Sequence, residues 1–256
     1  SRSIRVACTM LLAALAGSAF AGPITPPAGP VTSTMKTLTE VEPRIAINSV
    51  NTPGDATTMF IISQPGSYYL TSDIITTGNK IGIRILASDV TIDLNGMSVR
   101  RAAGATGGSA IRDDGNTEDA EQTITVRNGT ISGFATAGSY GIYSGGNTTV
   151  AARDLSLLNC TFGVSVEYGP LHASGVTATG ISTTTGSGIR GSSGTIIDAS
   201  SVTNFGTGYD VYEGLITDSI ATQCGIGARL TRARVENFNA STTFSGAVGI
   251  EASAYS

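Results

Sequence analysis

The sequence contains no tryptophan and a single histidine, and charged residues make up only 13% of its 256 positions. Its formal net charge is −4, and no segment concentrates lysine or arginine. An acidic balance without a basic patch argues against non-specific binding to nucleic acid. One histidine and three widely separated cysteines also do not supply the ligands of a structural zinc site.

The motifs that identify common enzyme classes are missing as well. The chain has no nucleophile elbow, phosphate-binding loop, dinucleotide fingerprint or zinc-ligand spacing. Residues that favour helices are scarce, whereas Thr, Ser, Gly, Ile and Val dominate. A composition of this kind, with 33 glycines, is typical of short strands joined by tight turns.

What the chain does contain is a short repeated unit, which occurs twice between Gly141 and Gly180. Each copy opens with a glycine and a β-branched residue, as in Gly141-Ile142, and later carries two apolar residues five positions apart. The same spacing recurs at Leu94/Val99, Val126/Ile131, Val150/Leu155, Leu171/Val176, Ile197/Val202, Leu215/Ile220 and Leu230/Val235. The opener recurs at Gly82, Gly163, Gly188 and Gly249, with looser versions at Ala110-Ile111 and Asp210-Val211.

This spacing predicts short strands separated by a turn. Residues an odd number apart cannot share one face of a straight strand, so a turn such as Asn128-Gly129 must return both to the interior. Small residues should then fill the next inward position, at Gly96, Ala152, Ala173 and Ala199. One unit cannot bury its own apolar face, so the units must stack. We therefore expect an all-β fold, a right-handed parallel β-helix solenoid of about seven or more coils with a short N-terminal arm and cap.

At this point the chain resembles the pectin-lyase-like class of secreted β-helix proteins, and most of all its uncharacterised bacterial members. These open with a segment like PRIAINSVNTPGDATTMFIISQPGSYYLTSDI, here Pro43 to Ile74, and the resemblance covers roughly Thr39 to the end. Hydrolases of the polygalacturonase type within this class need clustered carboxylates and a Gly-His-Gly motif. This sequence has one adjacent Asp pair, and its His172 stands in Leu-His-Ala. The resemblance thus implies the fold more strongly than any activity.

The N-terminal residues differ from the repeating part. Residues 1–21 have the form of a signal peptide, because Arg2 and Arg5 precede an apolar run and Ala19-Phe20-Ala21 supplies small residues before a cleavage point. The apolar run is too short for a membrane span. We therefore expect a protein that is secreted or displayed at a bacterial cell surface, with no membrane span in the mature chain.

Residues 22–58 follow as a Pro-rich arm, which should be extended as far as about Leu38, and a transition segment from Thr39 to Thr58. The β-helix is expected over residues 59–256, with Phe60 to Ile74 as its first turn and natural cap. The last unit opens at Gly249-Ile250 and stops before any apolar pair, so we expect the solenoid to be incomplete at its C-terminus.

Cys160 and Cys224 occupy similar positions three units apart. Strands stack about 4.8 Å apart, which separates the two residues by roughly 14 Å. A disulfide needs Cα atoms within about 7 Å. We expect two free, packed thiols.

The residue after the first apolar position of each unit should face solvent, and it forms a column that contains Arg127, His172 and Asp198. In this register His172 and Asp198 lie on adjacent coils, about 5 Å apart at the backbone. A carboxylate beside a histidine orients the ring and raises its pKa, as general-base chemistry requires. The alternative is an exposed sheet face whose polar residues are merely solvated.

A second outward column follows the glycine opener, and its binding candidates are Arg84, Arg112, Tyr143, Arg190 and Tyr212. Ser165 and Glu251 also belong to this column. Tyrosine rings stack on sugar rings, and guanidinium groups pair with carboxylate or sulfate. The column therefore predicts a site for an extended anionic polysaccharide, with an ordinary polar surface as the alternative.

The loop RDDGNTEDAEQ, from Arg112 to Gln122, offers a possible Ca²⁺ site through Asp113, Asp114, Glu118 and Asp119. Its spacing departs from that of an EF-hand loop. A solvated surface insertion is the alternative. Lyases of the pectin-lyase-like class use such ions to neutralise substrate carboxylates.

Three functions remain open at this point. The first is a secreted solenoid, extracellular or at the cell surface, that binds glycans or serves a structural role without a recognisable catalytic site. The second is a lyase or related enzyme acting on acidic polysaccharide, with its base drawn from His172, Tyr143 or an arginine and Ca²⁺ as electrophile. The third is a purely structural stalk. Fold alone does not choose among them.

Overall fold

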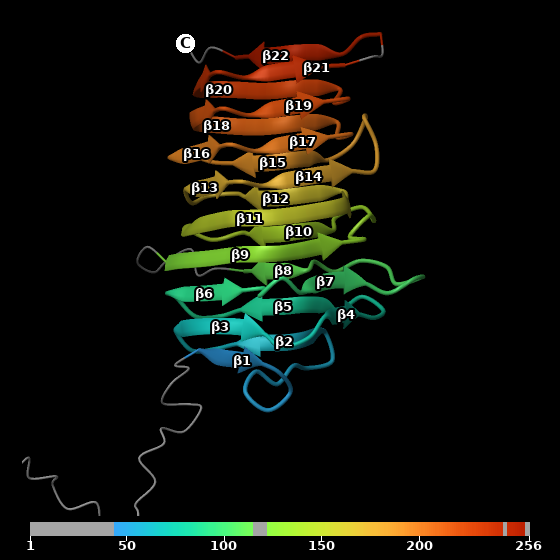
Figure 1. The fold of residues 1–256 in the computed structure, drawn as a ribbon, viewed down its shortest axis with the longest axis vertical. Coiled ribbons are helices and arrows are strands. Elements are labelled where there is room, and N and C mark those ends of the chain that lie inside the picture. Colours follow the sequence, from blue (N-terminus) through green and yellow to red (C-terminus); the bar gives the residue numbers. More distant parts are fainter. Residues whose placement is uncertain (1–43, 115–121, 243–244, 254–256) are drawn as a thin grey trace, which may run out of the picture. The chain divides into compact units, whose positions relative to one another are not determined.

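The computed structural model describes residues 44–114, 122–242 and 245–253. Over these residues the chain is all-β, and its strands pair in parallel as it winds into a solenoid of about nine turns. Figure 1 shows the coils stacked one above another, with front strands such as β9 (Gln122–Ser132) and β14 (Thr177–Gly180) running left to right as the chain climbs. That is the right-handed sense. The predicted signal peptide and residues 22–43 of the predicted arm and transition segment lie outside the described residues.

The strand pairings define three faces, which we call A, B and C. Face A consists of β2 (Thr58–Ile62), β5 (Ile81–Ile85), β8 (Ile111–Asp113), β10 (Tyr140–Ser144), β12 (Phe162–Val166), β15 (Ser187–Gly191), the first halves of β18 (Thr207–Thr217) and β20 (Ile226–Glu236), and β22 (Val248–Ala252). Each of these strands pairs in parallel with the equivalent strand one coil away. Face A carries the candidate site described below.

Face B consists of β1 (Ile45–Ile47), β3 (Gly66–Leu70), β6 (Val90–Asp93), the first halves of β9 and β11 (Thr148–Cys160), β13 (Leu171–Ser174), β16 (Thr195–Asp198) and the second halves of β18 and β20. Because β1 pairs with β3, parallel stacking within the described residues already includes Ile45, ahead of residue 59, where the β-helix is predicted to begin.

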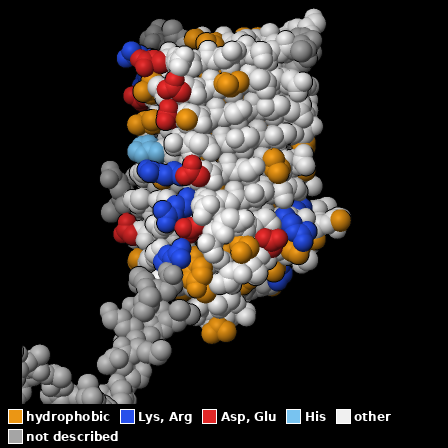
Figure 2. All heavy atoms as spheres, viewed as in Figure 1, with side chains coloured by type: hydrophobic (Ala, Val, Ile, Leu, Met, Phe, Trp, Pro, Cys, Tyr) orange, Lys and Arg blue, Asp and Glu red, His pale blue; other side chains and the backbone are white. Residues whose placement is uncertain are grey.

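Face C consists of β4 (Ile74–Thr76), β7 (Ser98–Arg101), the second halves of β9 and β11, β14, β17 (Ser201–Thr203), β19 (Ile220–Thr222) and β21 (Asn239–Ser241). Its outward positions are mostly hydroxyl residues such as Thr177, Thr179 and Thr203. In Figure 2 the upper part of this broad face is largely white, whereas charged side chains gather along the left edge, over the strands of face B, and in a second group at the lower right.

The predicted interior is confirmed at the four central apolar pairs. All eight apolar residues of the four central pairs are 0–2% exposed: Val126, Ile131, Val150, Leu155, Leu171, Val176, Ile197 and Val202. They belong to one apolar core whose buried residues run from Ile47 to Leu230. The pair Leu215/Ile220 was wrong by one residue, because Ile216 and Ala221 point inward there and Ile220 is exposed.

The five-residue spacing has its origin in a one-residue corner between faces B and C. In successive coils this corner is Asn128, Asp154, Gly175, Ala199, Asp218 and Asn237, and every one of them has a positive φ between 45° and 63°. A single left-handed residue turns the chain while both flanking strands stay in their ladders. The predicted inward positions Gly96 and Ala199 are therefore wrong, since both are exposed at corners, whereas Ala152 and Ala173 are buried as predicted.

The glycine opener also has a steric cause. Gly141, Gly163, Gly188, Gly208 and Gly227 stack in one column, where each faces the carbonyl oxygen of the next glycine. A Cβ at Gly188 would lie 2.7 Å from the Gly208 oxygen and 2.7 Å from a Val202 methyl group on face C. Faces A and C approach too closely for any side chain there, so the opener marks a fixed place in every coil.

Cys160 and Cys224 are buried free thiols, as predicted. Each stands in the corner that leads from face C to face A, directly after a residue with positive φ. Gly180 and Phe205 occupy the same corner in the two coils between them. The two thiols are therefore packing groups of the core.

Candidate functional site

A column of charged, aromatic and hydroxyl side chains runs along face A, one residue from each coil. The strand register places in it Arg84, Arg112, Tyr143, Ser165, Arg190, Asp210, Arg229 and Glu251, which we call the face A ladder. Four of the five predicted binding residues lie in it, in the predicted order. Tyr212 does not, and Asp210 takes its place.

The displacement of Tyr212 has a clear cause. The coil that contains it opens with Gly208-Tyr209, and the buried Tyr209 lies beside Ile189, the apolar residue of the preceding opener. The predicted opener of this coil, Asp210-Val211, was therefore wrong by two residues. Tyr209 is the largest fully buried side chain of the core, and its hydroxyl donates to the Ser200 carbonyl at 2.7 Å.

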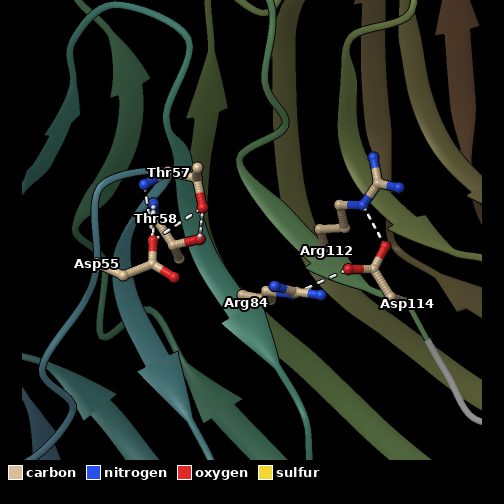
Figure 3. Close-up of polar contacts among 6 residues, drawn as sticks. All are labelled: Asp55, Thr57, Thr58, Arg84, Arg112 and Asp114. Carbon is tan, nitrogen blue, oxygen red and sulfur yellow. Dashed lines mark hydrogen bonds and ion pairs between the residues drawn. The ribbon is translucent and has the colours of Figure 1, made fainter.

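Two arginines share one carboxylate at the N-terminal end of the ladder. Arg84 Nε lies 2.9 Å from Asp114 Oδ2, and Arg112 Nε pairs with Asp114 Oδ1 (Figure 3). Both guanidinium groups are about one-third exposed. They come from consecutive coils, so Asp114 joins the two rungs across the face.

Asp55 lies beside Arg84 in the same close-up and caps a turn of the chain (Figure 3). Its Oδ1 accepts hydrogen bonds from the Thr57 and Thr58 backbone N–H groups, each at 2.7 Å. The hydroxyl and N–H of Thr57 lower the pKa of Asp55, with a smaller contribution from the charge of Arg84. Asp55 is therefore a structural carboxylate.

Three partly buried aromatic rings form a cluster in the middle of face A. The Tyr140 and Phe162 rings stack with centroids 4.8 Å apart, and Tyr143 lies against Tyr140 at 4.7 Å. The Arg112 guanidinium covers the Tyr143 ring at 4.9 Å. We call Tyr140, Tyr143 and Phe162 the aromatic platform. The sequence analysis missed Tyr140 and Phe162, although each directly precedes a glycine opener.

Tyr143 links the platform to an acidic residue, Glu167. Burial raises the pKa of Tyr143, and the nearby charge of Glu167 and a hydrogen bond with it raise that pKa further, whereas Arg112 opposes the shift. The phenol therefore stays protonated at neutral pH, when it donates hydrogen bonds and cannot act as a base. Next to it in the ladder, the buried Ser165 hydroxyl has no hydrogen-bond partner among the described residues.

In the C-terminal half of the ladder the charges alternate. Arg190 Nε lies 3.9 Å from Asp210, and Arg229 Nε lies 3.0 Å from Glu251. Every arginine of the ladder thus has a carboxylate partner among the described residues. Such half-exposed pairs add little to stability, and they cancel much of the positive charge that the sequence predicts for this surface.

Two shallow clefts lie on either side of this half of the ladder. One has a volume of about 340 Å³ and is lined by Val166, Glu167, Arg190, Gly191, Ser192, Asp210, Tyr212 and Thr231. The other has a volume of about 470 Å³ and is lined by Phe162, Thr184, Gly186, Ser187, Gly206, Thr207, Gly225, Ile226 and Arg229. Tyr212 therefore lies beside the ladder, in the first cleft, with Arg232 over its ring at 5.6 Å.

The predicted catalytic residues lie on face B, not on the ladder. His172 pairs with Ala151 and Ile196, whereas Asp198 pairs with Ser174 and accepts a hydrogen bond from Thr217 Oγ1 at 2.8 Å. The predicted His172–Asp198 adjacency is therefore wrong by two residues along the strand. The single histidine stands out in pale blue at the charged edge in Figure 2.

Arg127, the third predicted catalytic residue, has a structural partner. Its Nη2 lies 3.2 Å from Asp93 Oδ2, and Asp93 also accepts hydrogen bonds from the Asn95 N–H at 2.8 Å and from Asn128 Nδ2 at 3.1 Å. Asp93 is largely buried, so this network holds the corner between faces B and C.

The predicted Ca²⁺ ligands are only partly described. Asp113 is buried and accepts a hydrogen bond from Ser144 Oγ at 2.8 Å, and Asp114 is held by Arg84 and Arg112. Glu118 and Asp119 lie outside the described residues. Over the part of the chain that is described, no three acidic, histidine or cysteine side chains come together as a metal site.

Within the described ranges no helix is long and apolar enough to span a membrane. Comparison with known proteins finds no matching family model, no matching curated protein and no matching solved structure.

Proposed function

We propose that this protein is an extracellular or cell-surface solenoid that binds polysaccharide along face A. The observation that supports the proposal best is the aromatic platform, where three partly buried rings pack together at the surface of face A beside Arg112. Aromatic residues on a soluble protein are usually buried, and a stack of rings that stays partly accessible beside hydrogen-bonding groups favours a binding surface. Tyrosine and phenylalanine rings offer flat apolar faces to the C–H side of a sugar ring.

The ladder supplies the polar contacts that such a ligand needs. Coils repeat about every 4.8 Å, which is close to the length of a sugar ring, so neighbouring rungs can meet successive sugars of one chain. The predicted ligand is an anionic polysaccharide, and Arg84 and Arg112 can direct further N–H donors to acid groups. Since both already pair with Asp114, stacking should contribute more to affinity than charge does.

Binding is preferred to lyase activity on the geometry of the candidate bases. A ligand on face A would not meet His172, Asp198 or Arg127, which stand on face B. Tyr143 does lie on face A, but its raised pKa keeps it protonated. Secretion belongs to the proposal too, and the leader-like residues 1–21 support it.

The test is calorimetric titration of the protein with oligosaccharides of increasing length, both neutral and anionic. Affinity should rise with length, because each stacking or charge-assisted contact contributes about 1 kcal/mol. The double variant Tyr140→Ala/Tyr143→Ala should bind at least about tenfold more weakly, since two such contacts are lost. Tyr69→Ala is the matched control, because Tyr69 also lies under an arginine, Arg44, but on face B.

A parent protein that binds no glycan in the panel would overturn the proposal. Equal losses in the platform and control variants would do so too, because they would show that the platform has no special role. Circular dichroism of each variant establishes that the solenoid is intact.

A further inference from the structure

The first cleft of face A lies next to the aromatic platform and has the features of a distinct subsite. Its volume of about 340 Å³ falls within the range of small-molecule sites. Glu167 connects the two regions, because it lines the cleft and is hydrogen-bonded to the Tyr143 phenol of the platform. The cleft and the platform are therefore neighbours on face A.

The charged side chains that line the cleft do not suit an anionic ligand. Two carboxylates, Glu167 and Asp210, face one guanidinium, that of Arg190. Just outside, Glu213 accepts a hydrogen bond from Ser193 at 3.1 Å, and Arg232 covers the Tyr212 ring, so these neighbours add one charge of each sign. The cleft is thus negative by one charge, and a uronate or sulfated sugar would be repelled from it.

The Arg190–Asp210 pair leaves hydrogen-bonding capacity within the cleft. At 3.9 Å it is the longest ion pair along the ladder, and both side chains are partly exposed. Carboxylates that are not fully engaged accept charge-assisted hydrogen bonds from sugar hydroxyls, and the free guanidinium N–H groups donate to ring and hydroxyl oxygens. Tyr212, 39% exposed at the wall of the cleft, offers a ring for stacking.

Resting on the function proposed above, we propose that this cleft is a subsite for an uncharged sugar unit, recognised through its hydroxyl groups by Glu167, Asp210 and Arg190 and through its ring by Tyr212. A polysaccharide that fits face A then carries a neutral unit at this position, whatever acid groups it has elsewhere. The predicted preference for a uniformly anionic chain does not hold at this subsite.

The experiment compares a neutral oligosaccharide with a uronate oligosaccharide of equal length and linkage, each titrated into the parent protein and its variants. In the parent, the neutral ligand should bind more tightly. Glu167→Gln and Asp210→Asn should each weaken binding of the neutral ligand several-fold, because each removes a charge-assisted hydrogen-bond acceptor. Each should strengthen binding of the uronate ligand, because it also removes a repulsive negative charge. Tyr212→Ala should weaken both ligands.

Glu236→Gln is the matched control, because it removes the same charge from an exposed pair, Arg234–Glu236, on face B. It should leave both affinities unchanged. If Glu167→Gln and Asp210→Asn change the affinities for the two ligands alike, or no more than the control does, the proposed subsite is refuted, whereas binding of glycan to the platform is not. If the parent protein binds no glycan at all, the proposed function itself is refuted.

Discussion

At the scale of single residues, burial changes the chemistry of side chains that the core uses for packing. Cys160 is completely buried, and this burial raises the pKa of its thiol from 9.0 to about 12, although Arg101 acts in the opposite direction. Burial also raises the pKa of Tyr209 and of Cys224. These groups are held in their neutral forms, which makes the thiols inert as nucleophiles.

The thiol of Cys160 should make stability sensitive to alkali. The pKa of this thiol in the folded state lies above its value in the unfolded state. The contribution of the buried thiol to the free energy of unfolding is therefore complete below about pH 9 and is lost as pH rises toward 12. Urea unfolding at several pH values from 8 to 11 should show stability falling by up to a few kcal/mol across this window. In Cys160→Ala the fall should be shallower. An unchanged slope in that variant would show that the thiol does not titrate as expected.

At the scale of the strands and turns, the corner between faces B and C is the recurring device. It requires a left-handed residue, and Asn, Asp or Gly occupies it in every coil from Asn128 to Asn237 except one, where Ala199 stands with a φ of 45°. Asparagine and aspartate tolerate this conformation through local hydrogen bonds, and glycine has no Cβ to clash. Alanine has neither advantage.

Replacing Ala199 by glycine should therefore stabilise the protein. Relief of the left-handed strain, about 1–2 kcal/mol, exceeds the entropic cost of glycine, about 0.5–1 kcal/mol, so a net gain of roughly 0.5–1 kcal/mol is expected. The midpoint of urea unfolding measures it. Ala151→Gly, within strand β11, is the control and should destabilise. A loss of stability in Ala199→Gly would contradict the corner explanation.

At the scale of the whole molecule, the glycine column determines how coils sit on one another. Each glycine lets a strand of face A approach face C and the next coil at backbone distance. This sets the cross-section of the solenoid, and it also repeats the ladder position, two residues after each glycine, at a constant place on the surface.

A methyl group in the middle of this column should be costly. Gly188→Ala places a Cβ 2.7 Å from the Gly208 oxygen and from Val202, so coils must move apart, and a loss of about 1–3 kcal/mol is expected in urea unfolding. Gly249→Ala is the control, because a Cβ there would come no closer than 4.0 Å to Ala240. It should be nearly neutral. Equal effects at the two sites would show that the column does not control stacking.

The sequence by itself determined the parallel β-helix, most of its inward residues and most of the ladder. Two apolar residues five positions apart can both face inward only if the chain bends between them. A unit this short cannot bury them by itself, so the coils must stack. Arg84, Arg112, Tyr143 and Arg190 were placed correctly because each follows an opener whose glycine position, or Ala110 in one coil, tolerates almost no side chain. Because a small residue is sterically required at the opener, its position in the sequence identifies the ladder residue two positions later.

Only the tertiary structure decided the register elsewhere. Val150 lies beside Ile124 rather than Val126, and His172 lies beside Ile196 rather than Asp198, each two residues from the predicted position. Because side chains alternate with a period of two, a shift by two residues keeps every side chain on its own face, and the apolar pattern does not distinguish the two registers. The contacts between coils do distinguish them. The prediction for Tyr212 was likewise off by two residues, so Tyr212 lies in the first cleft and Asp210 takes its place in the ladder.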